Sequence, residues 1–463
     1  MTFQHHNDVS IELSQGFPDL ALLHSANPQR YPFLLESVAQ GSTEARYDIL
    51  FAFPQASIVL NNKGQLSAEN LTLSGNDFLD NLDRCWQENN TSPQKNKQEL
   101  PFQGGWFVYL GYELAEQIEP VLNLPVSDDN DIDSYAVRIP AAIIRDHVTQ
   151  RCWVVCEKDS ESYLQSMHDD ISAIRTTSAV VNTNLIKAIH EQADQEYLDG
   201  VEIIRRYIIE GDVFQVNLSR QWSVDLSENV TDYQLYTSLC QNNPSPFAGI
   251  ANYAGMTIIS SSPERLVSVH QHCIETRPIA GTHPRATELD TDQALSAKLL
   301  AHPKERAEHI MLIDLERNDL GRVCVAGSIE VNELMVLESY THVHHIVSNV
   351  RGQIRDDVTP GEVIKAVFPG GTITGCPKVR CMEIIAELEK APRGAYTGSM
   401  GYLNNNGDMD LNILIRTMTR KGNKLSLRAG AGIVADSIAN NELEETRSKA
   451  KGLLRALGAA DKS

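Results

Sequence analysis

Short apolar runs with strand-like alternation, separated by tight turns, recur along this chain and constrain its fold more than any other feature. Residues 47–66 predict two strands and a turn, residues 139–159 predict a hairpin, and residues 395–437 predict several antiparallel strands. Helical spacing of apolar residues is found between such runs, for example at 161–175 and 195–212, where Gly211 is expected to end the helix. Strands at the centre with helices outside them predict an α+β fold.

The charge balance limits the partners of this fold. The 463 residues include 61 acidic and 40 basic side chains, which gives a net charge of −21. A field of this sign repels nucleic acid and anionic membranes, so neither is expected as a partner. No apolar run approaches the length of a membrane span, and the first residues do not resemble a secretory signal. The eight cysteines include no C-x-x-C pair, which favours reduced thiols and a cytoplasmic location.

One segment separates two regions that differ in their sequence patterns. Residues 176–184, TTSAVVNTN, are small and polar and are typical of a linker. We therefore divide the chain into an N-terminal region, 1–180, and a second region, 190–463, in which the chemistry-bearing motifs lie.

Two pairs of glutamates are the first such motif. Glu305 and Glu308 are three residues apart, as are Glu442 and Glu445. On a helix each pair shares one face. Two such helices facing each other would present four carboxylates to Mg²⁺, which prefers oxygen ligands. Each pair alone is equally typical of a solvent-exposed helix face.

Two glycine clusters form a second motif. Residues 368–375, FPGGTITG, place backbone amides and Thr372 just before a predicted helix, where the helix dipole favours an anion. Residues 428–434, RAGAGIV, would let a ligand approach the backbone, and Arg416 and Lys449 could add positive charge. Ordinary turns and surface cations are the alternative interpretation. Taken from the residues alone, the chain is a soluble α+β protein with a possible Mg²⁺-assisted site for a small carboxylate.

The motifs, in their order, resemble the chorismate-utilising enzyme family. The resemblance rests on GDVFQVNLSR, SPERLV, RPIAGTHPR, KERAEHIMLIDLERNDLGRV, FPGGTITGCPKVRCMEII and AGAGIVADS followed by NELEETRSKA. The N-terminal FLLES and GGWFVYLGYE extend it over nearly the whole chain. It implies two large β-sheets packed face to face, helices on the outside, and a site in the cleft between the sheets.

The resemblance also implies residue roles. The four glutamates hold Mg²⁺, with Glu308 and Glu445 as the nearest ligands, and the ion binds a substrate carboxylate. His345 protonates the leaving 4-hydroxyl group, and Thr282 lines the ring. The carboxylates and the enolpyruvyl arm of chorismate are held by Thr372, Tyr396, Arg416, Lys449 and the amides of Gly430, Ala431 and Gly432.

Two positions bear on the reaction. Family members that add water carry a lysine base where this chain has Gln215, and an uncharged amide cannot take that proton. Ammonia is then the expected nucleophile. The segments QVNL and FPGGTITG favour the branch that forms 4-amino-4-deoxychorismate for p-aminobenzoate and folate synthesis. Ala280 favours the anthranilate-forming branch, because many members of the first branch have a nucleophilic lysine there.

Two further expectations concern partners. The sequence has no glutaminase Cys–His arrangement, so a separate glutamine amidotransferase subunit is expected to supply ammonia. The FLLES segment resembles the family's tryptophan pocket, for which the candidate residues are Leu35, Glu36, Ser37, Pro244 and Phe247. A non-catalytic tryptophan-sensing subunit is therefore the alternative of a different functional class.

Overall fold

The computed structural model describes residues 8–12, 17–39, 45–89, 100–127, 131–158, 160–174, 185–285, 303–339 and 343–459. For residues 8–12, 280, 282–284, 303–305 and 343 only the backbone is described. The predicted linker, 176–184, lies outside these residues.

The strands of the described residues form two antiparallel sheets. Sheet I has twelve strands. In spatial order they are β1 (Asp8–Glu12), β9 (Arg151–Glu157), β8 (Ala141–Asp146), β3 (Tyr47–Ala52), β2 (Phe33–Glu36), β12 (Phe247–Tyr253), β13 (Met256–Ser262), β22 (Thr417–Lys421), β23 (Lys424–Ile433), β11 (Gln215–Leu226) and β10 (Ile186–Glu191), with β19 (Gly375–Cys376) paired to β11.

Sheet II has eleven strands within the same described residues. In order they are β16 (Ile279–Pro284), β18 (Val343–Gln353), β15 (Cys273–Thr276), β14 (Arg265–His270), β21 (Met409–Asn412), β20 (Ser399–Asn404), β6 (Gly105–Leu110), β7 (Ile132–Ile139), β4 (Ala56–Asn61) and β5 (Leu66–Glu69), with β17 (Glu330–Ser339) paired to β18.

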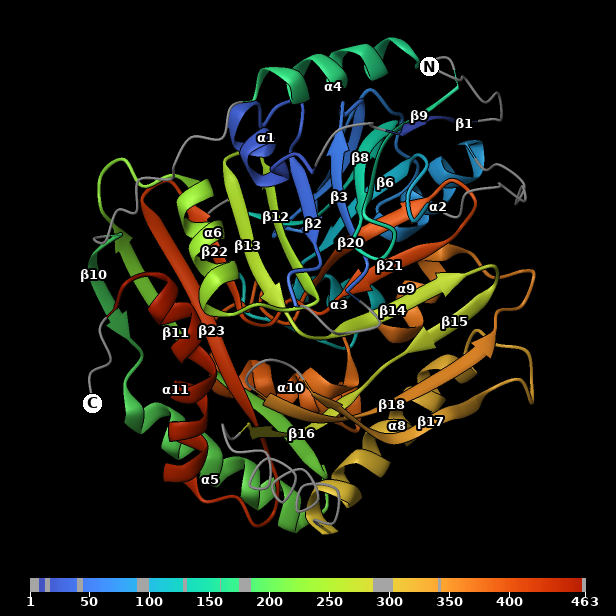
Figure 1. The fold of residues 1–463 in the computed structure, drawn as a ribbon. Helices are drawn as coiled ribbons and strands as arrows, with labels where there is room; N and C mark the ends of the chain where they lie inside the picture. The colour runs from blue at the N-terminus through green and yellow to red at the C-terminus, as the bar shows by residue number, and fades with distance from the viewer. Residues whose placement is uncertain are drawn as a thin grey trace.

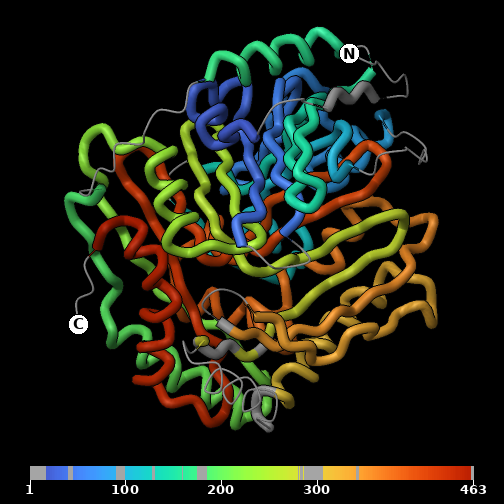
Figure 2. The backbone as a smooth tube through the Cα atoms, in the orientation of Figure 1, coloured from blue at the N-terminus to red at the C-terminus, as the bar shows by residue number. Residues whose placement is uncertain are grey.

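Both sheets combine strands from before and after residue 180. In sheet I, β2 pairs with β12, and in sheet II, β6 pairs with β20. Figure 2 shows the same mixing within the second region, where the red C-terminal strands β22 and β23 lie between β13 and β11. Neither sheet is therefore built by one region alone, and the division at 180 stays a prediction about function.

The two sheets pack face to face through a buried apolar layer. Phe33 and Phe51 of sheet I meet Phe107 of sheet II, and the rings of Phe33 and Phe107 stack with centroids 4.0 Å apart. Burial of such large rings supplies most of the energy that holds the layers together. The predicted α+β fold with two sheets face to face is confirmed.

Helices cover the outer faces of both sheets (Figure 1). Sheet I is covered by α1 (Leu20–Ala26), α4 (Ser162–Ala173), α6 (Asp232–Asn242) and α11 (Ala439–Ala456), and near β11 also by α5 (Asp194–Glu210) and α10 (Lys378–Glu389). Sheet II is covered by α2 (Phe78–Asn89), α8 (Pro303–Gly321) and α9 (Pro360–Val367). Two short 3₁₀ turns, η1 (Tyr112–Leu114) and η2 (Gly371–Ile373), and α3 (Ala115–Ile118) complete the helical elements of the described residues.

Local sequence sets several boundaries. Helix α9 begins at a capping box in which the Thr359 side chain accepts from the backbone of Glu362, and Pro360 occupies the first turn. Helix α5 ends at Gly211, whose φ of 89° is readily adopted only by glycine. The predicted helix at 161–175 is α4, and the predicted hairpin at 139–159 is β8 and β9. No helix in the described ranges is both long and apolar enough to cross a membrane.

Candidate active site

The end of β23 forms a glycine-lined wall. A Cβ atom at Gly430 would lie 2.7 Å from Asn217 Oδ1 and 2.8 Å from the Tyr396 hydroxyl oxygen. A Cβ atom at Gly432 would lie 2.2 Å from Gln215 Nε2. Only glycine therefore permits this close approach.

The residue between the two glycines faces the other way. Ala431 is fully buried in the apolar cluster beneath α5, α10 and α11, as strand alternation requires. Its side chain cannot reach a ligand on the glycine side. A contact of Ala431 with substrate, as predicted, would have to come from its backbone.

Gln215 joins this wall to one predicted metal ligand. Its Nε2 donates to Oε1 of Glu308 on α8 at 3.0 Å, and its own Oε1 is buried without a hydrogen bond. The amide therefore positions the carboxylate, and it cannot accept a proton as a lysine base would.

A second predicted ligand reaches the same wall through Lys449. This side chain pairs with Glu445 at 2.8 Å and donates to the Gly430 carbonyl oxygen at 3.0 Å. Glu308 is thus connected to Gly432 through one side chain, that of Gln215. Glu445 is connected to Gly430 in the same way through Lys449. Carboxylate oxygens are the donors that Mg²⁺ prefers, so the residues fit the ion by type. The described side chains, which omit that of Glu305, contain no group of three or more metal-binding side chains.

Glu264 is a site residue to which the sequence interpretation gave no role. It lies just before β14, is 6% exposed, and accepts a hydrogen bond from Thr372 Oγ1 at 2.8 Å and another from the Ile279 backbone. Burial raises its pKa to about 7, while Lys449 opposes this rise. Glu264 can therefore carry and release a proton near neutral pH. The sequence signal was its place in SPERLV, one of the motifs that carry the family resemblance, but no role was given to a residue of that motif.

His345 lies on β18 beside the segment that contains Ala280. It is 3% exposed, and its strand neighbour on β16 is Thr282. Burial and the positive charge of Arg416 lower its pKa to about 4, although a hydrogen bond to the Gly281 backbone opposes this. The imidazole is therefore neutral at pH 7, and the role of His345 as a proton donor stays a prediction. The side chains of Ala280 and Thr282 lie outside the described part of the structure.

Arg416 is a partly buried cation that directly precedes β22. Its Nη1 donates to Asn243 Oδ1 at 3.3 Å, and no carboxylate of a described residue forms an ion pair with it. Burial lowers its pKa. Because no described carboxylate compensates for its partial desolvation, this guanidinium is well suited to bind a carboxylate of a ligand.

The side chains of the predicted tryptophan pocket lie together but are engaged within the protein. Glu36 pairs with Arg145 at 2.7 Å and accepts from the Tyr236 hydroxyl at 2.7 Å, and burial raises its pKa to about 7. Ser37 Oγ donates to the Tyr47 carbonyl. Leu35 is paired with Gly249 on β12, and the next strand residues lead back to Phe247 and the neighbouring Pro244. Binding of tryptophan at this place stays a prediction.

Comparison with known proteins shows which family this chain resembles along most of its length. Residues 31–455 match the family model of chorismate binding enzymes. The chain is 43% identical to aminodeoxychorismate synthase component 1 of Bacillus subtilis, over 79% of this chain and 80% of that protein. It is 38% identical to anthranilate synthase component 1 of Synechocystis, over 93% of this chain and 91% of that protein.

A solved structure gives the same result for the fold. Anthranilate synthase component I of Streptococcus pneumoniae superposes with a TM-score of 0.79 at 33% identity, covering 89% of this chain and 93% of that chain. The family model spans the glycine wall, Glu264, His345 and Arg416 alike. The chain therefore belongs to the family of chorismate binding enzymes.

Proposed function

We propose that the chain is the chorismate-aminating component of an aminodeoxychorismate synthase, which converts chorismate and ammonia to 4-amino-4-deoxychorismate and water. The observation that carries the proposal is the contact between Gln215 and Glu308. An amide that donates to a carboxylate leaves no base to activate water at this position, and ammonia needs none.

The residues of the site have distinct tasks in this reaction. Arg416 binds a substrate carboxylate, and the Thr372 hydroxyl and the amides next to Gly430 and Gly432 orient the substrate. Glu264, with its pKa of about 7, donates a proton to the departing 4-hydroxyl group, which leaves as water. Nitrogen forms the new bond to the ring, and its surplus proton restores Glu264.

Mg²⁺ is the cofactor we propose, held by Glu305, Glu308, Glu442 and Glu445. When bound, the ion would neutralise a carboxylate of the dianionic substrate, which a chain of net charge −21 otherwise repels. We further propose that a separate glutamine amidotransferase subunit supplies the ammonia, as the designation component 1 of the relatives suggests.

Anthranilate synthesis is the second candidate, and Ala280 favours it because a small residue leaves the nucleophile free. In that reaction ammonia adds at C2 while the 4-hydroxyl group leaves as water, and pyruvate is then eliminated from the ring. The relatives named anthranilate synthase component 1 support this candidate equally.

The test is product analysis with the purified chain, chorismate, Mg²⁺ and an ammonium salt. We expect aminodeoxychorismate, seen by chromatography and mass, with no pyruvate in a coupled lactate dehydrogenase assay. Anthranilate fluorescence together with stoichiometric pyruvate would instead assign the second candidate. If no chorismate is consumed while tryptophan binds tightly, the chain is a sensing subunit and both candidates are wrong.

A further inference from the structure

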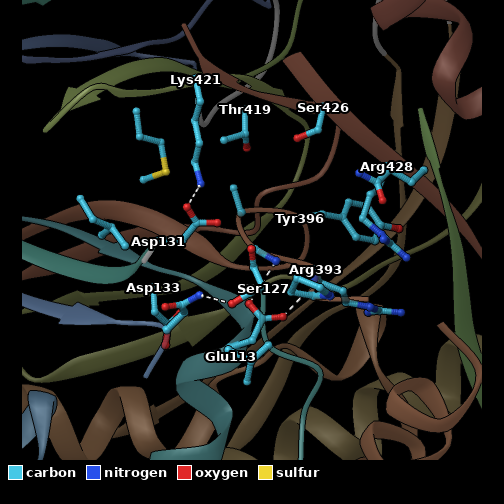
Figure 3. Close-up of a pocket in the computed structure, with 18 of the residues that line it drawn as sticks. Glu113, Ser127, Asp131, Asp133, Arg393, Tyr396, Thr419, Lys421, Ser426 and Arg428 are labelled. Carbon is cyan, nitrogen blue, oxygen red and sulfur yellow. Dashed lines mark hydrogen bonds and ion pairs between the residues drawn. The ribbon is translucent and has the colours of Figure 1, made fainter. Parts of the chain in front are cut away.

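A cavity of about 640 Å³ lies between the two sheets, outside the residues assigned above except for Tyr396 (Figure 3). Its walls come from β6, β7 and η1 on one side and from β11, β22 and β23 on the other. This volume can hold a small organic molecule.

One end of the cavity is acidic. Glu113, Glu116 and Asp133 line it, and the nearby Asp131 is already paired with Lys421 at 2.5 Å. Glu113 accepts the backbone N–H groups of Arg393 and Gly394, and Glu116 accepts that of Leu124. Both of these carboxylates therefore have donors from the protein.

Asp133 differs from the other two. It is 9% exposed, and its Oδ1 atom is buried without any hydrogen bond. That oxygen lies against Gly111, where a Cβ atom would approach it to 2.5 Å, so any side chain at 111 would displace it. A buried carboxyl oxygen with no donor is rare, because its desolvation is not compensated. Since Oδ1 is closed off against Gly111, a ligand in the cavity would meet the carboxyl group of Asp133 through its other oxygen.

The charges around Asp133 also leave its carboxyl group without compensation. Burial and the negative charges of Glu113 and Glu116 raise its pKa well above the usual value for aspartate. The pKa of Tyr109 in the same wall is also raised, by burial and by the negative charges of Asp133, Glu113 and Asp131. Arg393 and Arg428 both pair with Glu389, and the charge of Arg393 also opposes the rise of the pKa of Glu113, so the acidic end is compensated more at Glu113 than at Asp133.

From this geometry we infer that the cavity is a second ligand site, which receives an ammonium group at Asp133, Glu113 and Glu116. The ligand is either the ammonium ion or a small organic amine whose body fills the remaining volume. Tyr396 lines this cavity, and its hydroxyl also lies against Gly430 in the candidate active site, so the two sites share one residue. The inference does not rest on the proposed function, because it concerns binding alone.

Binding of benzylammonium, measured by calorimetry, tests the inference. Benzyl alcohol has nearly the same shape without the charge and serves as the matched probe. We expect benzylammonium to bind and benzyl alcohol not to bind. We also expect the binding enthalpy to differ between phosphate and Tris buffers, because the carboxyl of Asp133 must release a proton to pair with the amine.

Variants locate the site. Asp133→Asn should weaken benzylammonium binding about tenfold or more, since it removes the charge that the amine pairs with. Thr419→Phe should abolish binding by filling the cavity without changing its charge. Asp199→Asn, an equal change on the exposed face of α5, should leave binding unchanged.

Three results would overturn the inference: no binding of benzylammonium up to about 10 mM, equal binding of benzyl alcohol, or wild-type affinity in both Asp133→Asn and Thr419→Phe. Competition then separates the two sources of the ammonium group. Displacement of benzylammonium by ammonium chloride, but not by sodium chloride, identifies the ion itself as a ligand, and the lack of displacement identifies an organic amine.

Discussion

Two regions of this molecule bury charged side chains, and they treat them in opposite ways. In the N-terminal region, Glu36 and Asp48 both pair with Arg145, at 2.7 Å each, and His147 lies 2.6 Å from Asp48. In the candidate active site, Arg416 has no ion pair with a described carboxylate, and Glu264 accepts hydrogen bonds from Thr372 and Ile279 but has no ion pair with a described cation.

The difference separates structural charges from functional ones. A buried charge whose partner belongs to the protein holds the fold in place, and its attraction is already satisfied. A buried charge without a partner raises the energy of the empty protein and lowers it again when a ligand brings the opposite charge. Substitution should therefore affect stability in the first region and catalysis in the second.

The largest expected effect is that of Glu264→Gln. The amide cannot donate the proton of a carboxylic acid, so kcat should fall by about 10²–10⁴-fold. In the wild type, kcat should fall as the pH rises through about 7, where Glu264 loses its proton. Steady-state rates measured from about pH 5.5 to about pH 9, on both sides of this pKa, check both statements.

The same substitution has a stability signature. Because the pKa of Glu264 is raised on folding, its contribution to stability is present below its unfolded pKa and is lost as the pH rises through about 7. The variant should therefore be at least as stable as the wild type at pH 8. If Glu264→Gln kept its activity while His345→Gln lost it, the proton donor would be His345, as the sequence predicted.

Arg145→Met should have the next largest effect, on stability instead of catalysis. It leaves Glu36 and Asp48 buried without their shared cation, which should lower the free energy of unfolding by about 3–5 kcal/mol. Denaturant titration measures this loss, while kcat of the folded variant should stay unchanged. The matched control is Arg46→Met, whose ion pair with Asp146 is half exposed and should contribute only about 0–1 kcal/mol.

These contrasts were only partly available from the sequence. Alternation and turn residues predicted the hairpin of β8 and β9 and the helix α4, because such elements depend on neighbours in the chain. Family motifs placed Arg416 and Gly430 in the site. The partners of these residues could not be derived in this way, since Gln215 and Glu308 are 93 positions apart.

The burial of Glu264 shows the same limit. Its neighbours in the chain are serines, a proline and an arginine, which are typical of a surface turn. Its environment comes from Thr372 and Ile279, which reach it only when sheet II and η2 have formed. Pairing of charges is a property of the tertiary structure. The sequence could therefore identify charged residues, but it could not separate those with an ion pair inside the protein from those without one.

Arg416→Gln should act on substrate binding. Loss of a partly buried guanidinium that binds a carboxylate should lower kcat/KM for chorismate by about 30- to 5,000-fold, since such contacts are worth about 2–5 kcal/mol. The thermal midpoint should not fall, because the substitution removes a partly buried charge that has no ion pair with a described carboxylate. A large fall in the thermal midpoint with normal kcat/KM would place Arg416 among the structural charges.

The smallest expected effect is that of Gly432→Ala. The added Cβ atom would lie 2.2 Å from Gln215 Nε2 and so must displace the amide that holds Glu308. Loss of a group that orients a metal ligand typically weakens metal binding by about 10- to 100-fold, so the Mg²⁺ concentration for half-maximal activity should rise by that factor.

Ala431→Gly, on the opposite face of the same strand, removes a core methyl group and should cost about 1 kcal/mol of stability with no change in Mg²⁺ dependence. An unchanged Mg²⁺ dependence in Gly432→Ala would mean that Gln215 does not position Glu308 for the ion, and the contact that excludes water as the nucleophile would then have only a structural role.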